Sequence, residues 1–213
     1  MATILVIGAS RGIGLGTVKA ALAAGRDVRA FARSAQGIPV THAKLTKISG
    51  DALKRNNVAA AVQGADAVVQ SLGASSPANL VFGTTLFSEA TRILVDAMQT
   101  AGVRRLMMVT GAGAGNSRGR ISFLYDNLMF PLLLKRVYDD KDIAEDIVMK
   151  SGLDWTIVRP GLLTNGAATN RYKVLTEMKD WRGGAISRAD VADFLVKHLD
   201  DKTLFGTTPL LVD

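Results

Sequence analysis

Apolar residues occur in short runs that alternate with segments of helical periodicity along the whole chain. Residues 4–7 form one such run, and after it Leu15, Val18 and Leu22 recur at helical spacing. This alternation is typical of a parallel sheet covered by helices on both faces. The pattern predicts strands at 4–7, Asp27–Ala32, 44–48, 67–71, Arg105–Val109, 155–158 and Leu210–Val212, and helices at 51–63, 83–101 and 189–199.

No repeat and no linker divides the chain of 213 residues, which is long enough to bury one hydrophobic core without disulfides. We therefore expect an α/β protein with a single domain over residues 1–213. Its architecture should be a Rossmann-like, doubly wound parallel sheet with helices on both faces. Residues from about 111 onward should supply the substrate side.

The composition excludes several kinds of chemistry. The chain has no cysteine and only two histidines, His42 and His198, so we expect no metal site, disulfide, thiol nucleophile or histidine triad. The net charge of +7 comes from scattered lysines and arginines without an aromatic-interleaved motif, so we expect no nucleic-acid partner. A basic chain also suits a protein that attracts a polyanionic cofactor.

The most apolar segment, residues 121–134, is too short to cross a bilayer, which takes about 20 residues. Residues 121–134 fit three readings: a buried helix pair, an apolar wall or lid over a flat substrate, and a dimer patch. The first apolar run follows no basic residue and has the length of a strand, so it is not a signal peptide. We expect a soluble, cytoplasmic protein without a membrane span, as a monomer or homodimer.

Glycines at 8, 12 and 14 follow the first strand and open the first helix. Without Cβ atoms, such a turn lets phosphates approach the backbone N–H groups at the positive end of a helix. The arrangement therefore predicts a site for a dinucleotide pyrophosphate. The spacing Gly-x-x-x-Gly-x-Gly resembles the short-chain dehydrogenase/reductase superfamily.

The end of the second strand indicates which dinucleotide binds. NAD enzymes usually carry Asp or Glu there, which repels a 2′-phosphate. Here the strand ends in Arg33 and Ser34, and Arg11 lies in the glycine turn. Guanidinium groups bind phosphate through charge-assisted hydrogen bonds, so the sequence predicts NADP(H) as the cofactor.

Further motifs narrow the resemblance. They are Gly50-Asp51, Ser71-Leu72-Gly73, Val-Thr-Gly at 109–111, Tyr-Asp-Asp-Lys at 138–141 and Gly-Leu-Asp-Trp-Thr-Ile-Val-Arg-Pro-Gly at 152–161. Together they resemble the NmrA-like NAD(P)H-binding proteins among the atypical short-chain dehydrogenases. Within that group, the length and order are most similar to the biliverdin-IXβ reductase/flavin reductase type.

The resemblance implies a cofactor site along one edge of the sheet. It places Gly8, Ser10, Arg11, Gly12, Ile13 and Gly14 at the pyrophosphate and adenosine phosphate, Arg33 and Ser34 at the adenosine ribose, and Asp51 and Ala52 at adenine. It places Leu72 and Gly73 along the cofactor, Thr110 beside the nicotinamide, Lys141 at the nicotinamide ribose, and Pro160, Gly161 and Leu162 over the carboxamide.

Some of these residues have a simpler structural reading. Asp51 is also a good N-cap for the helix expected at 51–63. Gly111, Gly113 and Gly115 fit a mobile loop better than a second phosphate site. Asp190 fits a structural position in the first turn of a late helix.

The chain departs from the family at its acid–base pair. Typical members place a tyrosine four residues before the lysine, so that the lysine lowers the pKa of the phenol. Here Val137 stands at that spacing from Lys141, and Tyr138 is one position too close. This favours NADPH-dependent hydride transfer to a flat conjugated acceptor (a flavin, a quinone or a tetrapyrrole), with Thr110 and Lys141 as the catalytic candidates. The alternatives are a non-catalytic NADP(H)-binding redox sensor or scaffold and, less favoured, a nucleotide-sugar epimerase.

Overall fold

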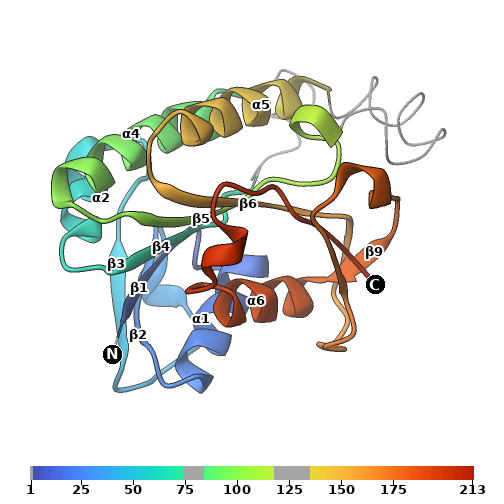
Figure 1. The fold of residues 1–213 in the computed structure, drawn as a ribbon. Helices are drawn as coiled ribbons and strands as arrows, with labels where there is room; N and C mark the ends of the chain where they lie inside the picture. Colours follow the sequence, from blue (N-terminus) through green and yellow to red (C-terminus); the bar gives the residue numbers. More distant parts are fainter. Residues whose placement is uncertain (1, 74–83, 118–134) are drawn as a thin grey trace.

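The structure, a computed structural model, describes residues 2–73, 84–117 and 135–213. A central sheet lies between two layers of helices (Figure 1). One face carries α1 (Gly12–Ala23) and α6 (Arg188–Lys197), and the other carries α2 (Arg55–Val62), α4 (Leu86–Ala101) and α5 (Lys135–Met149).

The main sheet has the strand order β3-β2-β1-β4-β5-β6-β10-β8. Its strands run parallel from β3 to β10, and β8 is antiparallel to β10 at the edge. The predicted Rossmann-like α/β fold is confirmed, with this antiparallel edge as a departure. The strands are β1 (Thr3–Ile7), β2 (Asp27–Ala32), β3 (Leu45–Ser49), β4 (Ala67–Gln70), β5 (Arg105–Val109), β6 (Asp154–Pro160), β8 (Lys173–Leu175) and β10 (Leu210–Val212), with β7 (Leu162–Thr164) and β9 (Ala185–Ser187) as a separate parallel pair.

Strand β1 shows why its sequence is a continuous apolar run. Ile4 and Val6 pack into the core below the sheet with α1 and α6, whereas Leu5 and Ile7 pack into the core above it. Successive side chains of a strand point to opposite faces, and here both faces are covered by helices. The run therefore lies at the centre of the sheet.

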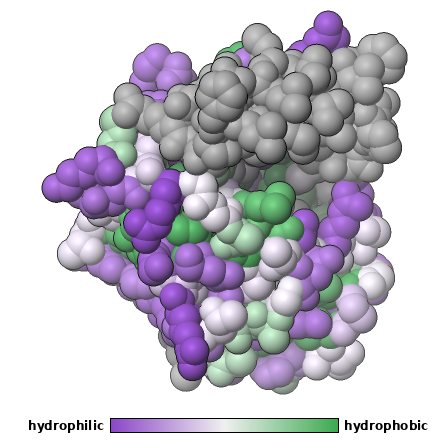
Figure 2. All heavy atoms as spheres, turned by 90° about the vertical axis from the view of Figure 1, so that its right-hand side faces the viewer, coloured by the Kyte–Doolittle hydropathy of each residue, from purple (hydrophilic) through white to green (hydrophobic). Residues whose placement is uncertain are grey.

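The strand order reverses at β1, which pairs with β2 on one side and β4 on the other. Ligands of open parallel sheets bind at such a switch point, outside the carboxyl ends of the strands. Strand β10 runs parallel to β6 and ends near the C-terminus, at the right of Figure 1. Figure 2 views the molecule from that side and shows apolar residues near the middle of the face with hydrophilic residues around them.

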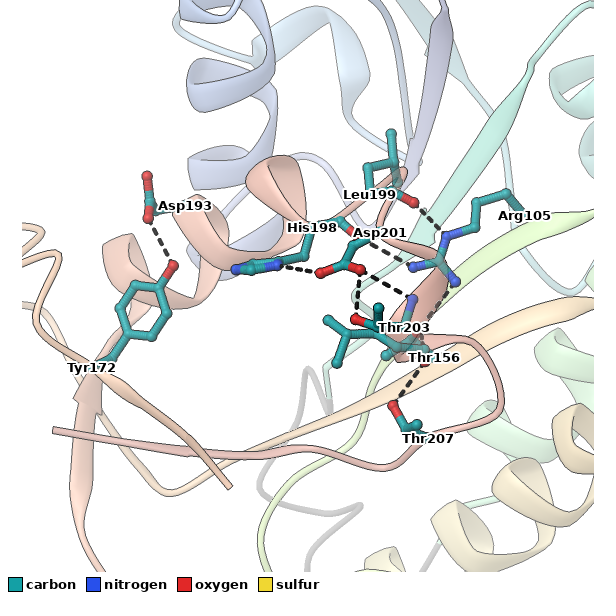
Figure 3. Close-up of polar contacts among 10 residues, drawn as sticks. Arg105, Thr156, Tyr172, Asp193, His198, Leu199, Asp201, Thr203 and Thr207 are labelled. Atoms are coloured by element: carbon teal, nitrogen blue, oxygen red, sulfur yellow. Dashed lines mark hydrogen bonds and ion pairs between the residues drawn. The ribbon is translucent and has the colours of Figure 1, made fainter. Parts of the chain in front are cut away.

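The opposite end of the sheet holds a polar group that we call the base cluster (Arg105, Thr156, His198, Leu199 and Asp201), shown in Figure 3. Arg105 is buried and donates to the carbonyl oxygen of Leu199 at 2.5 Å and to the hydroxyl of Thr156 at 2.9 Å. It also donates to the carbonyl oxygen of His198 at 3.4 Å, at the end of α6. The cluster ties β5 and β6 to the end of that helix.

The region around Asp51 differs from its prediction. The helix begins at Arg55 with Lys54 as its N-cap, not at residue 51. The Asp51 carboxylate instead accepts a hydrogen bond from the backbone N–H of Leu53 at 3.0 Å. Asp51 therefore closes a tight turn before the helix, which leaves it at the carboxyl end of β3.

The pattern also missed β7, β8 and β9, each of which has three residues. So short a strand has too few positions to show a period of two. The apolar segment 121–134 lies outside the described residues, so its three readings stay predictions. In the part of the chain that the structure describes, no helix is long and apolar enough to cross a membrane.

Candidate functional site

A cavity of about 830 Å³ opens at the carboxyl ends of the strands around the switch point. It brings together residues that are far apart in the sequence. The predicted site residues that line it are Gly8, Ser10, Arg11, Gly12, Ile13, Arg33, Asp51, Ala52, Leu72, Gly73, Thr110 and Lys141.

Five predicted residues are not among those that line it. Gly14 is buried within α1, and Ser34 is exposed beyond the end of β2. Pro160 is buried in β6, Gly161 follows it, and the side chain of Leu162 is 72% exposed. Their contacts with the cofactor stay predictions.

The glycine turn has the geometry of a phosphate cradle. Gly8 and Gly12 have φ values of 85° and 57°, which side chains rarely adopt. A Cβ on Gly8 would lie 2.6 Å from the carbonyl oxygen of Ser71, so no larger residue fits there. No side chain caps α1, whose first N–H groups are therefore available to an anion. These features fit a dinucleotide pyrophosphate.

The end of the cavity at β2 and β3 carries positive charge. Arg33 follows β2, and Arg11 precedes α1; both are exposed and line the cavity. Asp51 and Ala52 line it from the carboxyl end of β3. The end of β2 carries no carboxylate, so this part of the cavity suits an additional phosphate on the adenosine ribose.

Thr110, at the carboxyl end of β5, is tied to a residue that the sequence analysis missed. Its hydroxyl donates to Oε1 of Glu145 at 2.7 Å, and both side chains are buried. The single hydrogen of the hydroxyl is thereby engaged. Toward a ligand in the cavity, Thr110 is an acceptor and not a proton donor.

Glu145 also forms an ion pair with Arg159. The Nη2 of Arg159 lies 2.6 Å from Oε2 of Glu145, and the two side chains are 1% and 0% exposed. Another nitrogen of Arg159 donates to Oδ1 of Asn116 at 2.6 Å. We call this group (Thr110, Asn116, Glu145 and Arg159) the site cluster. Glu145 lies four residues after Lys141 on one helix, so the two side chains share a face of that helix. This spacing could have indicated from the sequence that Glu145 lies near the site.

The glycines at 111, 113 and 115 lie in a packed, hydrogen-bonded turn, and their mobility stays a prediction. Gly111 and Gly113 are buried, and the N–H of Gly113 donates to Ser117 Oγ at 2.9 Å. Gly115 has a φ of 53°, and a Cβ there would lie 2.5 Å from Nη2 of Arg159. The glycines are needed because the chain turns tightly over the site cluster.

Lys141 on α5 lies beside Thr110 at the wall of the cavity. Its Nζ donates to the carbonyl oxygen of Thr110 at 2.7 Å. It also lies 5.2 Å from the ring centre of Phe87 and 4.6 Å from that of Tyr138. Burial lowers the pKa of Lys141 to about 8, and nearby carboxylates such as Glu145 oppose this shift only in part.

Tyr138 lies close to Lys141 in space although its spacing differs from that of the family. A Cβ on Gly111 would be 2.8 Å from the Tyr138 hydroxyl oxygen and 3.8 Å from Nζ of Lys141. A three-residue step on a helix brings side chains to one face. Tyr138 is nevertheless not among the described residues that line the cavity, so its ring supports Lys141 from outside the cavity.

Several residues that line the cavity were not predicted from the sequence. Arg188 begins α6 and reaches the cavity from the C-terminal part of the chain, and Leu163 and Asn165 do so from the segment after β6. Asp190 is structural, as expected, because its buried carboxylate accepts hydrogen bonds from Ser187 and from the backbone of Thr169. No cluster of three or more metal-ligating side chains occurs within residues 2–73, 84–117 and 135–213.

Comparisons with known proteins agree with this geometry. A family model described as NAD(P)H-binding matches residues 8–202. ChuY, an anaerobilin reductase from Escherichia coli O157:H7, superposes with a TM-score of 0.82 at 27% identity, over 99% of this chain and 96% of that one. A short-chain dehydrogenase/reductase from Veillonella parvula DSM 2008, in complex with NADP, gives 0.84 at 20% identity over 100% and 94%.

Two curated relatives show a wider range of descriptions. An uncharacterized sugar epimerase of Bacillus subtilis, YhfK, is 30% identical over 145 residues, which are 68% of this chain and 62% of that protein. The chloroplastic protein TIC 62 of Pisum sativum is 29% identical over 219 residues, 90% of this chain and 39% of that protein. The chain thus spans less than two thirds of either relative. Its cytoplasmic location stays a prediction.

Proposed function

Because this chain belongs to the NAD(P)H-binding family, we propose that it is an NADPH-dependent reductase of a flat conjugated acceptor such as a linear tetrapyrrole, a flavin or a quinone. The observation that carries the proposal is the cavity itself. One space joins the uncapped glycine turn, three arginines and the pair of Thr110 and Lys141, while Tyr138 is not among its described lining residues.

The choice of NADPH over NADH rests on charge at the adenosine end. Arg11 and Arg33 both line the cavity there, and the end of β2 bears no carboxylate to repel a 2′-phosphate. Arg33 is exposed and follows directly from a buried strand, so the strand fixes its backbone beside the cavity. We expect NADH, which lacks that phosphate, to bind more weakly.

At the nicotinamide end, Thr110 and Lys141 position the cofactor and the acceptor and do not themselves react. When bound, the reduced nicotinamide supplies a hydride. Thr110 presents only acceptor lone pairs to the cavity, because its hydroxyl already donates its hydrogen bond to Glu145. Lys141 presents N–H donors and suits a ribose hydroxyl. A conjugated acceptor spreads the incoming negative charge, so water in the open cavity can provide the proton that completes the reduction.

The likeness to ChuY supports a linear tetrapyrrole among the possible acceptors. The test is a panel of acceptors, namely biliverdin isomers, flavin mononucleotide and a naphthoquinone, followed by the loss of NADPH absorbance with purified protein. Lys141→Met should lower turnover, whereas Lys150→Met, at a position 80% exposed just after the end of α5, should not. NADPH binding without turnover of any flat acceptor would contradict the proposal.

A non-catalytic redox sensor or scaffold is the second candidate. Two observations favour it. The hydroxyl of Thr110 already donates its hydrogen bond to Glu145, and the phenol of Tyr138 is not among the described groups that line the cavity. Such a protein would bind NADP(H) with turnover of no acceptor in the panel. An epimerase, suggested by the likeness to YhfK, would instead convert a nucleotide sugar with no net consumption of NADPH.

A further inference from the structure

Arg188 reaches the glycine turn from the opposite end of the chain. It is the first residue of α6, and α6 packs against α1 below the sheet. A Cβ on Gly12 would lie 3.8 Å from Cδ of Arg188 and 3.9 Å from its Nε. Its side chain therefore lies beside the start of α1, where the cavity needs a partner for phosphate.

The hydrogen bonds of Arg188 leave its charge uncompensated. Its Nη1 donates to the carbonyl oxygen of Thr164 at 3.1 Å and to Oδ1 of Asn165 at 2.8 Å, with a longer contact to the carbonyl oxygen of Leu163 at 3.3 Å. All three acceptors are neutral. Within the described chain Arg188 forms no ion pair, and the nearby Asp190 carboxylate is occupied by Ser187 and Thr169.

The cavity divides its positive charge between its two phosphate positions. Arg33 lies at the end of β2, the adenosine end, whereas Arg188 lies beside Gly12 at the start of α1. On the proposed function, the first position faces a 2′-phosphate and the second a pyrophosphate. At the start of α1 the backbone dipoles of the glycine turn and the exposed Arg11 face the cavity, and Arg188 adds a second guanidinium there from α6.

We propose that Arg188 binds the pyrophosphate of the dinucleotide through Nε and Nη2, while Nη1 holds residues 163–165 against the cavity. The inference rests on the proposed function, because it assumes that a dinucleotide occupies this cavity. It adds a contact between the C-terminal part of the chain and the cofactor. Leu163 and Asn165, which line the cavity, are positioned by the same guanidinium group that meets the phosphate.

The test separates the two phosphate positions with fragments of the cofactor. ADP carries the pyrophosphate without a 2′-phosphate, and adenosine 2′-monophosphate carries the 2′-phosphate without a pyrophosphate. Calorimetry should show that Arg188→Gln weakens the binding of NADPH and of ADP about ten- to hundredfold and leaves the binding of adenosine 2′-monophosphate unchanged. Arg33→Gln should do the reverse, weakening NADPH and adenosine 2′-monophosphate and sparing ADP.

Two further variants keep the test decisive. Asn165→Ala removes one acceptor of Nη1 but keeps the charge, so ADP binding should change much less than in Arg188→Gln. Arg188→Lys keeps the charge with fewer donors and should fall between the wild type and Arg188→Gln. Should Arg188→Gln lose its thermal unfolding transition, Arg188→Lys carries the test, with ADP weakened and adenosine 2′-monophosphate spared.

Each remaining outcome contradicts a different claim. Unchanged ADP binding in Arg188→Gln, or equal weakening of both fragments, would overturn the role of Arg188 while leaving the dinucleotide site intact. Failure of the wild type to bind NADPH or either fragment would overturn the proposed function itself.

Discussion

Two buried arginines lie at opposite ends of neighbouring strands, and their surroundings differ. Arg105 begins β5 in the base cluster, where backbone carbonyls and the hydroxyl of Thr156 receive its hydrogen bonds. Arg159 lies near the carboxyl end of β6 in the site cluster, where the carboxylate of Glu145 faces it. An arginine therefore binds uncharged acceptors at one end of the sheet and pairs with a carboxylate at the other.

The difference follows from what each end must hold. At the base, the guanidinium donates to carbonyls at the C-terminus of α6, the negative end of the helix dipole, and nearby carboxylates such as Asp154 act on it only through space. Burial lowers the pKa of Arg105 to about 10, which still leaves it charged at neutral pH. At the site, Glu145 is shared between Arg159 and Thr110, so the pair fixes a hydroxyl at the cavity wall.

Breaking the site pair should have the largest effect. Arg159→Met leaves Glu145 buried without a counter-charge and should lower the free energy of unfolding by about 3–5 kcal/mol. Denaturant unfolding of the protein without ligand measures this. The double variant Glu145→Met/Arg159→Met removes both charges and should recover to within about 2 kcal/mol of the wild type.

The double variant also tests what the pair is for. Thr110 loses its acceptor there, so turnover should stay low although stability returns. Full activity in the double variant would show that the site cluster serves the fold alone. A single variant as stable as the double would contradict the account of a buried, uncompensated carboxylate.

Replacing Arg105 should cost less. Arg105→Met removes hydrogen bonds to neutral acceptors and leaves no charge behind, so we expect a loss of about 2–3 kcal/mol. Affinity for NADPH, measured by calorimetry, should stay at the wild-type value because the base lies at the other end of the sheet. A loss of affinity at intact stability would contradict the division between the two ends.

The first strand, the glycine turn and α4 were predictable because local patterns specify them. The apolar run of β1 and the glycines at 8, 12 and 14 each follow from neighbours in the sequence. The helix 83–101 was also placed to within a few residues, since α4 spans Leu86–Ala101 and carries an apolar stripe on one side. Gly102, with a φ of 71°, ends it.

The site cluster and Arg188 were not predictable in the same way. Glu145 and Thr110 are 35 positions apart and meet only because α5 packs over the sheet, against β6. Arg188 meets Asn165 and Gly12 only because α6 packs against α1. Such partners depend on tertiary packing, which a single sequence does not display. At Asp51 a local pattern was misleading. This residue type is a good N-cap, but here its carboxylate accepts a hydrogen bond within a tight turn before the helix.

A third prediction concerns the lysine beside the site cluster. Folding lowers the pKa of Lys141 from 10.5 to about 8, so wild-type stability rises with pH between those values. Lys141→Met should therefore raise the free energy of unfolding by about 1 kcal/mol below pH 8, after allowance for partial exposure and the lost bond to Thr110. The gain should vanish by about pH 10.5.

The same shift makes the function of the site depend on pH. Above about pH 8 Lys141 loses its charge, so NADPH affinity of the wild type should fall there. Lys141→Met should lack this step, whereas Lys150→Met should keep it. Calorimetry across pH 7 to 9 measures the difference, and a step that persists in Lys141→Met would assign it to another group.

The smallest effect is expected at the exposed rim of the base cluster. Asp201 accepts hydrogen bonds from the N–H and hydroxyl of Thr203, and its carboxylate lies 3.0 Å from Nδ1 of His198 (Figure 3). These contacts lower the pKa of Asp201 from 3.8 to about 2. A lowered carboxylate pKa contributes stability above pH 3.8 that is lost as the pH falls toward 2. Asp201→Asn should therefore flatten the loss of stability in that range.

Asp200→Asn is the matched control, because Asp200 is an exposed neighbour that pairs with Arg26 at 2.6 Å. Because an exposed ion pair is worth little, Asp200→Asn should change the slope of stability between pH 4 and 2 less than Asp201→Asn does, as followed by urea unfolding at each pH. Neither variant should change NADPH affinity, since neither Asp200 nor Asp201 is among the described residues that line the cavity. A slope equal to the wild type in Asp201→Asn would mean that the contacts with Thr203 and His198 persist in the unfolded chain or do not form.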